Sequence, residues 1–397
     1  MKEVVTENLQ ERWKVDSFQP KTEKFEKALA YCVDKVRENL AILGDKIPKE
    51  VAPDGIYEGG ENCFWTAGFW PGMIWIAYAV TGDKEFLAAG KRQSASFKQR
   101  LEADYDLQHH DIGFLYSPSS VADYILTGDE EARQVAIDAA YRMTKMYRMK
   151  AGIIQRGGDM EDLTDKFTGV FIVDCMNNVP LLFWAAKETG DKVLYDMALN
   201  HMKHSVDVLI QKNGAICQSG VANVKTGEIV CDFSLAQGKG GADAAWGRGQ
   251  AWAIAGLPVT YDYTKDPEFL EAAKPVVNFF LNRMPSDLIS DWDLYYTDDE
   301  TQRDTSASAI AVCGLLEIAD YLPDGDEYKA YYRSAAYRIL ESLIDNYQTK
   351  EDENSMGLLN AGVYGMSWKG VDMPNIFGDY YYMEALYRVC KDFKRFW

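Results

Sequence analysis

Apolar residues recur along the chain at the spacing of helical faces. Over roughly 23–42 they fall at every third or fourth position, from Phe25 and Leu29 to Val36 and Leu40, while Lys and Glu occupy the positions between them. This period predicts an amphipathic helix with one face buried. Further along, six openings rich in small, aromatic or acidic residues each lead into a more apolar helical stretch, near residues 65, 111, 174, 246, 304 and 377.

The ends of the apolar stretches also follow a pattern. Three of them end in Thr-Gly-Asp, at 81–83, 127–129 and 189–191; the next ends in Thr-Lys-Asp at 264–266, and another near 323–326. A glycine can take the left-handed conformation past a helix end, and the following Asp can cap the next helix. Six openings therefore predict six helical hairpins. Hairpins that each bury one apolar face must stack, and six can close into a ring.

The fold expected is all-α, an (α/α)6 barrel with apolar inner helices and amphipathic outer helices. All inner helices would then begin at one end of the barrel, where residues distant in sequence converge. Two segments interrupt the pattern. Residues 213–240 predict a β-hairpin around 225–227, with strands at 214–217 and 228–231, and 350–375 predicts an irregular loop. Both are long enough to border an active site.

Composition is consistent with one large domain. The chain has 397 residues, 47% of them hydrophobic, and we expect a single domain over 1–397 with the first ~20 residues as an extension. No apolar stretch reaches the ~20 residues of a membrane helix, and the N-terminus lacks a secretory pattern. Seven scattered cysteines without a CxxC favour free thiols. These features together predict a cytoplasmic protein.

Net charge and aromatic content limit the kinds of partner that the protein is expected to bind. The net charge of −19 argues against nucleic acid or an anionic membrane as partner. It does not exclude a small anionic substrate, which experiences only the local field. Aromatic residues make up 13% of the chain, which suits a groove that stacks on sugar rings, although core packing explains most of them.

Two acids are the main candidates for chemistry. Asp111 and Asp174 each stand at the opening of an apolar helix, and apolar residues 171–173 precede Asp174. The alternative is that each is only an N-cap. A buried carboxylate is costly unless it is paired or used, and a second carboxylate close by raises the pKa of one of the two. Such a pair fits acid catalysis in a sugar-cleaving enzyme.

Other residues near the same openings are candidates for binding. His110 could contact substrate hydroxyls or a carboxylate, or could be structural. Arg248, between two glycines, offers a planar fork to a carboxylate, the alternative being a structural pair with an interior acid. Trp65, Trp70, Trp246 and Trp252 are stacking candidates. His201 and His204 lie on a polar helix, where we expect solvent exposure, and no metal site is predicted.

The ordered motifs resemble those of unsaturated glucuronyl hydrolases, glycoside hydrolase family 88. The resemblance covers the chain from about residue 20 to its end, in WTAGFW at 65–70, HDIGFLYSPSS at 110–120, DCMNNVPLL at 174–182, WGRGQAW at 246–252 and FGDYYYMEAL at 377–386. It implies the (α/α)6 fold and glycosaminoglycan degradation without a metal or organic cofactor. The implied reaction hydrates the C4=C5 double bond of a 4,5-unsaturated uronic acid and so releases the neighbouring sugar.

The resemblance also implies roles. Asp174 would protonate C4 and help to activate water, while Asp111 would hold substrate hydroxyls and tune Asp174. The unsaturated sugar and its neighbour would be bound by His110, Trp65, Trp246, Arg248 and Gln250. The substrate partner is thus an unsaturated uronyl oligosaccharide, and we expect a monomer or weak homodimer.

Two departures from the family pattern concern specificity. Family members that accept sulfated disaccharides have a Ser-x-x-Ser-x-Lys pattern in a C-terminal loop. This chain has the second Ser and the Lys of that pattern, as Ser367 and Lys369, but Tyr364 at the first position. A partial sulfate site is therefore expected. The stretch 155–158 lacks a Trp that some members place after a similar Ile-Ile-Gln. The alternatives in function are an unsaturated rhamnogalacturonyl hydrolase on the same scaffold, an ordinary inverting glycosidase, or a non-catalytic carbohydrate-binding barrel.

Overall fold

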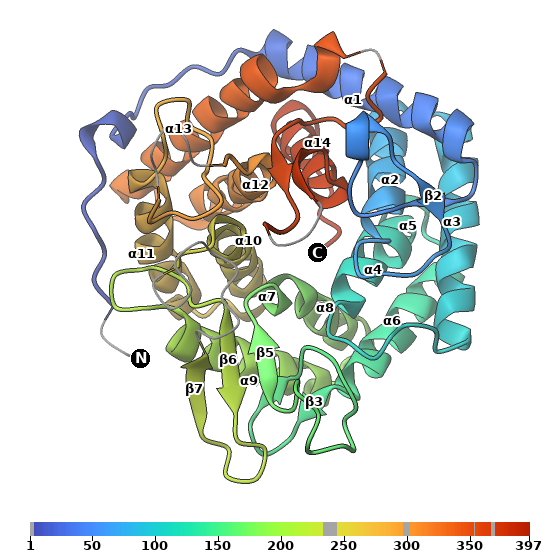
Figure 1. The fold of residues 1–397 in the computed structure, drawn as a ribbon, viewed down its shortest axis with the longest axis vertical. Coiled ribbons are helices and arrows are strands. Elements are labelled where there is room, and N and C mark those ends of the chain that lie inside the picture. The colour runs from blue at the N-terminus through green and yellow to red at the C-terminus, as the bar shows by residue number, and fades with distance from the viewer. Residues whose placement is uncertain (1–3, 233–243, 297–301, 353, 367–369) are drawn as a thin grey trace.

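The computed structural model describes residues 4–232, 244–296, 302–352, 354–366 and 370–397. Helices dominate, and Figure 1 shows them as two concentric rings. The inner ring consists of α2 (Phe69–Thr81), α4 (Ile112–Tyr116) continued by η3 (Ser117–Val121) and α5 (Ala122–Thr127), α7 (Cys175–Asn178) with α8 (Pro180–Thr189), α10 (Gly247–Thr264), α12 (Thr305–Tyr321) and α14 (Ile376–Cys390).

The outer ring covers these helices. It consists of α3 (Lys84–Glu102), α6 (Glu130–Thr144), α9 (Lys192–Leu209), α11 (Glu268–Asn282), α13 (Glu327–Ser342) and α1 (Thr22–Leu43). Helix α1 confirms the first predicted helix almost to the residue. It packs beside α14, so the first and last helices of the chain form the sixth pair and close the ring. The predicted all-α (α/α)6 barrel is confirmed.

The helix ends have the predicted geometry. Gly82, Gly128 and Gly190 adopt the left-handed conformation, with φ of 70°, 74° and 76°. Lys265 takes the same conformation, with φ of 54°, where the fourth stop has no glycine. The Asp that follows each glycine accepts hydrogen bonds from backbone N–H groups of the next helix. The pairs α2–α3, α5–α6 and α8–α9 are therefore each joined by a tight turn that Gly and Asp stabilise locally.

Short strands gather at one end of the barrel. The largest sheet is antiparallel and has the order β5 (Val170–Ile172), β6 (Ser219–Ala222), β7 (Ile229–Asp232). Three two-stranded pieces complete the described set: β1 (Ile47–Pro48) with β2 (Gly59–Gly60), β3 (Tyr147–Arg148) with β4 (Ile153–Ile154), and β8 (Gly362–Val363) with β9 (Val371–Met373). Short helical turns lie at η1 (Glu11–Trp13), η2 (Pro53–Gly55), η6 (Leu343–Tyr347) and η7 (Thr349–Glu351).

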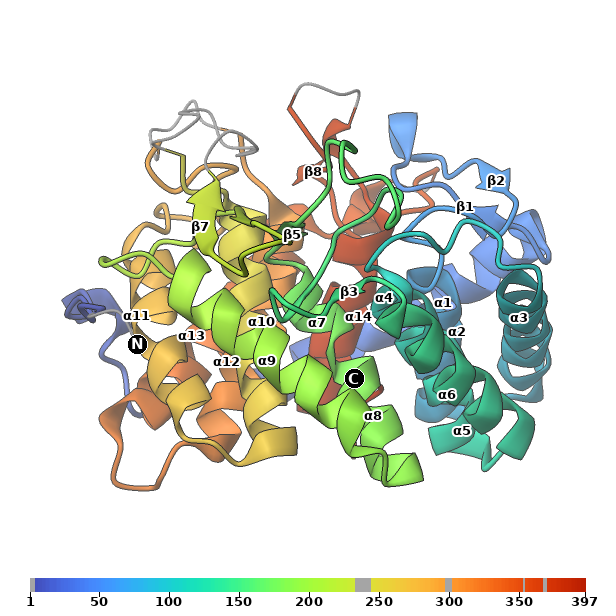
Figure 2. The same cartoon turned by 90° about the horizontal axis from the view of Figure 1, so that it is seen from below.

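The predicted hairpin is correct in its second strand and wrong in its first. The first strand is β6, which lies a few residues beyond the predicted 214–217, and β6 also pairs with β5, which the sequence did not indicate. Residues 350–375 are less irregular than predicted, because β8 and β9 pair within them. In Figure 2 these strands and their loops lie together at one end of the barrel, and the helix-to-helix turns lie at the other.

Two predictions about individual side chains are wrong. Cys217 and Cys231 form a disulfide across the foot of the β6–β7 hairpin, and the remaining five cysteines are free. The hairpin brings together two thiols whose spacing in sequence gave no indication of pairing. His201 is fully buried instead of exposed, and its Nδ1 accepts a hydrogen bond from the N–H of Ile154 at 3.0 Å. Burial lowers the pKa of His201 to about 3, so it is a neutral structural residue.

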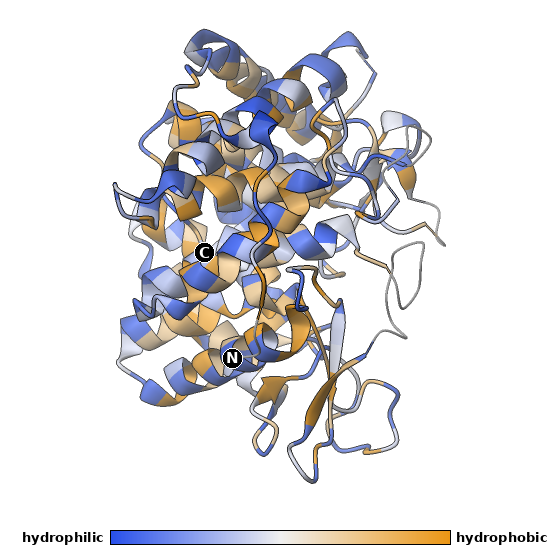
Figure 3. Cartoon of the chain, turned by 90° about the vertical axis from the view of Figure 1, so that its left-hand side faces the viewer, coloured by the Kyte–Doolittle hydropathy of each residue, from blue (hydrophilic) through white to orange (hydrophobic). Residues whose placement is uncertain are grey.

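Both ends of the chain pack against the barrel. In the N-terminal extension, the indole of Trp13 is buried and donates to the carbonyl of Leu281 in α11 at 2.7 Å. At the other end, Trp397 enters the ring, stacks on Tyr381 and donates to Glu384 at 2.8 Å. In Figure 3 hydrophobic and hydrophilic stretches alternate along the helices, and hydrophobic stretches also occur on the strands. Among the described residues, no helix combines the length and apolar character needed to cross a bilayer.

Candidate active site

A cavity of about 460 Å³ opens at the end of the barrel where the inner helices begin. Its walls come from residues far apart in sequence, because each inner helix contributes its first turn or the loop before it. The strands and loops that surround this end are visible in Figure 2. Lining residues include Trp65, His110, Asp111, Arg156, Phe167, Asp174, Gln218, Trp246, Arg248, Trp252 and Tyr364.

Asp111 and Asp174 both face this cavity, and neither caps a helix. Asp111 precedes α4 and Asp174 precedes α7, yet neither side chain accepts a capping hydrogen bond. The acids before α3, α6 and α9 do cap their helices. The alternative interpretation of the pair as simple N-caps therefore does not describe this structure. Each side chain keeps 13% of its surface exposed, so a ligand in the cavity can reach both.

His110 lies between the two acids. Its Nε2 is 3.3 Å from Oδ1 of Asp111 and 3.7 Å from Oδ1 of Asp174. That Asp174 oxygen accepts no hydrogen bond from the described residues. One ligand atom from each of the three residues lies within 4.8 Å of the others, a spacing that could also hold a cation. His109 adds a contact from the outside, since its Nδ1 accepts from the N–H of Asp111 at 3.1 Å.

The surroundings separate the pKa values of the two acids. Burial and the neighbouring charge of Asp111 raise the pKa of Asp174 to about 8, although Arg156 and Arg248 oppose the shift. Burial also acts to raise the pKa of Asp111, but the neighbouring His110, His109 and Arg156 outweigh it and hold that pKa below its usual value. Burial lowers the pKa of His110 to about 4. Near neutral pH the site thus holds one protonated carboxyl, one carboxylate and a neutral imidazole.

Asn178 fixes the spacing of the two helix openings. Its Oδ1 accepts from the N–H of Phe114 at 2.6 Å, and its Nδ2 lies 3.4 Å from Oδ1 of Asp111 and from the carbonyl of Asp174. The two backbones approach closely here because residue 113 is glycine. A Cβ at Gly113 would lie 2.2 Å from the carbonyl oxygen of Asn178. This contact between α4 and α7 brings the two acids into one cavity.

Aromatic rings form much of the wall. Trp65 stacks on Tyr364 and Phe377, and its indole N–H donates to the Tyr364 hydroxyl at 3.1 Å. Trp246 and Trp252 line the same cavity. Trp70 is buried in the core away from the cavity lining. Three of the four predicted stacking residues therefore reach the site.

Arg248 and Gln250 are held mainly by the protein. Arg248 donates to Asp304, to the carbonyl of Val363 and, at 2.8 Å, to the carbonyl of Tyr364. It lines the cavity while pairing an interior acid. Gln250 does not line the cavity: its amide bonds to the backbone of Ile216, Gly214 and Val276 use both of its polar atoms. The expectation that Gln250 binds substrate is not supported, because this fully buried side chain braces the loop after α9.

The structure also adds lining residues that the sequence did not predict to bind substrate, although one of them lies in the stretch 155–158, which lacks a Trp of some family members. Arg156, Phe167 and Gln218 border the cavity from the loop after β4 and from the segment before β6. Hydrophobic periodicity gave no indication of them, since they lie outside the helices. Ser367 and Lys369, the expected anion-binding pair, lie outside the described residues.

Comparison with known proteins agrees with this geometry. The family model described as Glycosyl Hydrolase Family 88 matches residues 42–393. The chain belongs to glycoside hydrolase family 88. An unsaturated chondroitin disaccharide hydrolase of Streptococcus pyogenes serotype M1 is 40% identical over 377 residues, covering 94% of this chain and 93% of that protein. The protein is accordingly a glycosidase.

Other relatives extend the comparison. An unsaturated glucuronyl hydrolase of Bacillus sp. strain GL1 is 35% identical and covers 94% of this chain and 98% of that protein. The crystal structure of unsaturated glucuronyl hydrolase from Streptococcus agalactiae superposes with a TM-score of 0.95, at 36% identity and complete coverage of both chains.

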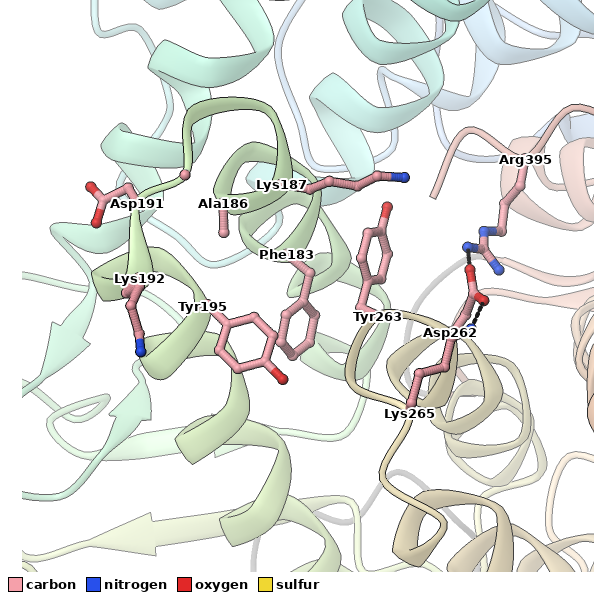
Figure 4. Close-up of a pocket in the computed structure, with 11 residues that line it drawn as sticks. Phe183, Ala186, Lys187, Asp191, Lys192, Tyr195, Asp262, Tyr263, Lys265 and Arg395 are labelled. Carbon is pink, nitrogen blue, oxygen red and sulfur yellow. Dashed lines mark hydrogen bonds and ion pairs between the residues drawn. The ribbon is translucent and has the colours of Figure 1, made fainter.

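The present protein has a second cavity, of about 540 Å³, at the opposite end of the barrel. It lies where α8 and α10 end, at Gly190 and Lys265. Figure 4 shows Asp262 there between Lys265 and Arg395. Burial acts against ionisation of Asp262, but these two cations hold its pKa at about 2. Asp191 is likewise engaged in capping α9, so this second cavity offers no carboxyl suited to acid catalysis.

Proposed function

We propose that the protein hydrolyses lyase-generated oligosaccharides that end in a 4,5-unsaturated uronic acid. One observation carries the proposal: Asp174 and Asp111 both lie next to His110 in a cavity walled by aromatic rings, surroundings that raise the pKa of Asp174 and lower that of Asp111. Acid catalysis on a weakly basic carbon requires a proton donor of raised pKa placed directly against the substrate. The protein's relatives support the substrate class, since they include unsaturated chondroitin disaccharide and unsaturated glucuronyl hydrolases.

The reaction begins with the vinyl ether of the unsaturated sugar. Asp174 donates its proton to C4, and the positive charge that develops is shared by C5 and the ring oxygen. Water then forms a bond to C5 and returns a proton to the Asp174 carboxylate. The product is a hemiketal at C5. It opens by cleavage of the bond between C5 and the ring oxygen, and the hemiacetal left at C1 releases the neighbouring sugar.

Neighbouring residues support this step. The ionised Asp111 lies close enough to stabilise positive charge and to accept hydrogen bonds from ring hydroxyls. Neutral His110 touches both acids and can hold a hydroxyl in a fixed orientation. Trp65, Trp246 and Trp252 supply flat apolar surfaces against which a sugar ring can stack.

The test is loss of ultraviolet absorbance of the conjugated double bond when wild-type protein meets an unsulfated unsaturated chondroitin disaccharide. Asp174→Asn should lower kcat by at least about a thousandfold, because the proton donor is lost while shape is kept. Asp83→Asn is a matched control, since Asp83 caps α3 and Asn caps almost equally well. The proposal fails if wild type leaves all unsaturated disaccharides intact, or if Asp174→Asn keeps full activity. Parallel assays on unsaturated rhamnogalacturonyl and saturated substrates separate the alternatives.

A further inference from the structure

The basic side chains that line the cavity differ in how many of their donors already bind other groups of the protein. Arg248 donates to Asp304 and to two backbone carbonyls. His109 and His110 contact Asp111, and His109 also contacts the carbonyl of Asp106. Arg156 is different. Its backbone is paired, but its guanidinium makes no hydrogen bond or ion pair within the described parts of the chain. Its donors are therefore available to a ligand.

Arg156 is nevertheless held in place. Its N–H donates to the carbonyl of Val170 at 2.8 Å, and its own carbonyl accepts from the N–H of His110 at 3.1 Å. The guanidinium lies 4.6 Å from the centre of the Phe167 ring, which also lines the cavity. Stacking on an aromatic face leaves the edge of the guanidinium, with its fork of donors, free to point elsewhere. The arrangement is typical of a preorganised site for an oxyanion.

Arg156 lies where it can contact the sugar that is linked to the unsaturated uronic acid. The uronic acid must contact Asp111 and Asp174 in the cavity, so its neighbour extends from there toward solvent. Arg156 is half-buried and lies at the start of the loop between β4 and β5, which rises above the inner helices in Figure 2. Its charge is still felt by both acids, so it lies within reach of a disaccharide bound to them.

We propose that Arg156 binds a sulfate group on the sugar next to the unsaturated uronic acid. A guanidinium fork matches two oxygens of a sulfate, as it matches those of a carboxylate or phosphate. This inference rests on the proposed function, because it takes the unsaturated disaccharide as the occupant of the cavity. One structural relative, an Asp-to-Asn variant of the Streptococcus agalactiae enzyme, is complexed with the sulfated disaccharide dGlcA-GalNAc6S.

The experiment measures binding in an Asp174→Asn background, in which substrate is not consumed and the effect of Arg156 on the pKa of Asp174 is absent. Titration calorimetry with 6-sulfated and unsulfated unsaturated chondroitin disaccharides gives two dissociation constants. Adding Arg156→Ala should weaken binding of the sulfated ligand about tenfold, the size expected for a charged hydrogen bond at a half-exposed site, and of the unsulfated ligand less than about twofold. Arg156→Lys, which keeps the charge but loses the fork, should fall between these values.

Lys166→Ala is the matched control. Lys166 lies 4.8 Å from the centre of the same Phe167 ring, carries the same charge on the same loop, and does not line the cavity. It should leave both dissociation constants unchanged. Equal losses for both ligands in Arg156→Ala would overturn the inference, since they would indicate contact with the uronate carboxylate common to both. Absence of binding by the sulfated disaccharide would overturn it as well.

The proposed function is tested separately, by turnover of the unsulfated disaccharide with wild-type protein. If that turnover is absent, the proposed function itself fails. If turnover is present and the Arg156→Ala losses are equal for both ligands, only the assignment of Arg156 fails.

Discussion

Asp174 keeps its proton because the fold places it out of water and next to a charge of the same sign. Its partner, Asp111, keeps its charge because two histidines contact it. The division of roles therefore follows from which neighbours each carboxyl has, since the two side chains are chemically identical. His201 illustrates the same rule: burial against the backbone of Ile154 makes it neutral.

A pH profile should report this division. Because Asp174 acts in its protonated form and its pKa is raised to about 8, kcat/KM should be kept below that pH and fall as pH rises through it. The profile belongs to the coupled pair of acids rather than to one residue. Arg156→Ala should move the alkaline limb to higher pH, because Arg156 lowers the pKa of Asp174. Lys166→Ala should not move it. An alkaline limb at the same pH in Arg156→Ala would contradict this electrostatic role.

At the scale of elements, the same residue type serves two purposes. Asp83, Asp129 and Asp191 accept hydrogen bonds from the helices they precede, at the end of the barrel with the tight turns. Asp111 and Asp174 precede helices at the other end and cap nothing. The sequence context of both sets looks like a helix start, so only the contact between α4 and α7 reveals which acids are available for chemistry.

The β6–β7 hairpin carries one wall of the cavity. Gln218 lines the cavity next to Cys217, whose disulfide to Cys231 closes a loop with a sequence separation of 14. Closing a loop of this size restricts the unfolded chain and stabilises the fold by up to about 3 kcal/mol. Dithiothreitol should therefore lower the denaturant midpoint of wild type, measured by tryptophan fluorescence. The double variant Cys217→Ser/Cys231→Ser should start from the lower midpoint and show no response to reductant. A wild-type midpoint that reductant leaves unchanged would contradict the stabilising role.

At the scale of the whole molecule, the ring is completed by the two ends of the chain. Helix α1 supplies the outer partner of α14, and Trp397 fills the interior against Tyr380, Tyr381 and Phe114. Arg395 ties the same segment to Glu317 and Asp262 of two inner helices. Closure of the barrel thus depends on contacts between residues hundreds of positions apart.

Trp397→Ala should be strongly destabilising. It removes a buried indole and one of the hydrogen bonds that Glu384 accepts, changes that typically cost about 3 kcal/mol or more together. Met149→Ala is the control, since Met149 is 76% exposed and should change stability by less than about 0.5 kcal/mol. Urea unfolding of both variants provides the comparison. Equal urea midpoints for the two variants would show that Trp397 does not stabilise the barrel.

The sequence by itself determined the architecture and the acid pair. Apolar periodicity and Gly-Asp stops are local features, so they specified the helices, their ends and the number of hairpins, and the helix openings pointed to Asp111 and Asp174. The tertiary structure alone decided what these side chains meet. Arg248 and Gln250 proved to be engaged within the protein, Arg156 proved to be available, and two cysteines proved to be joined. Such outcomes depend on contacts between distant segments, which no local pattern records.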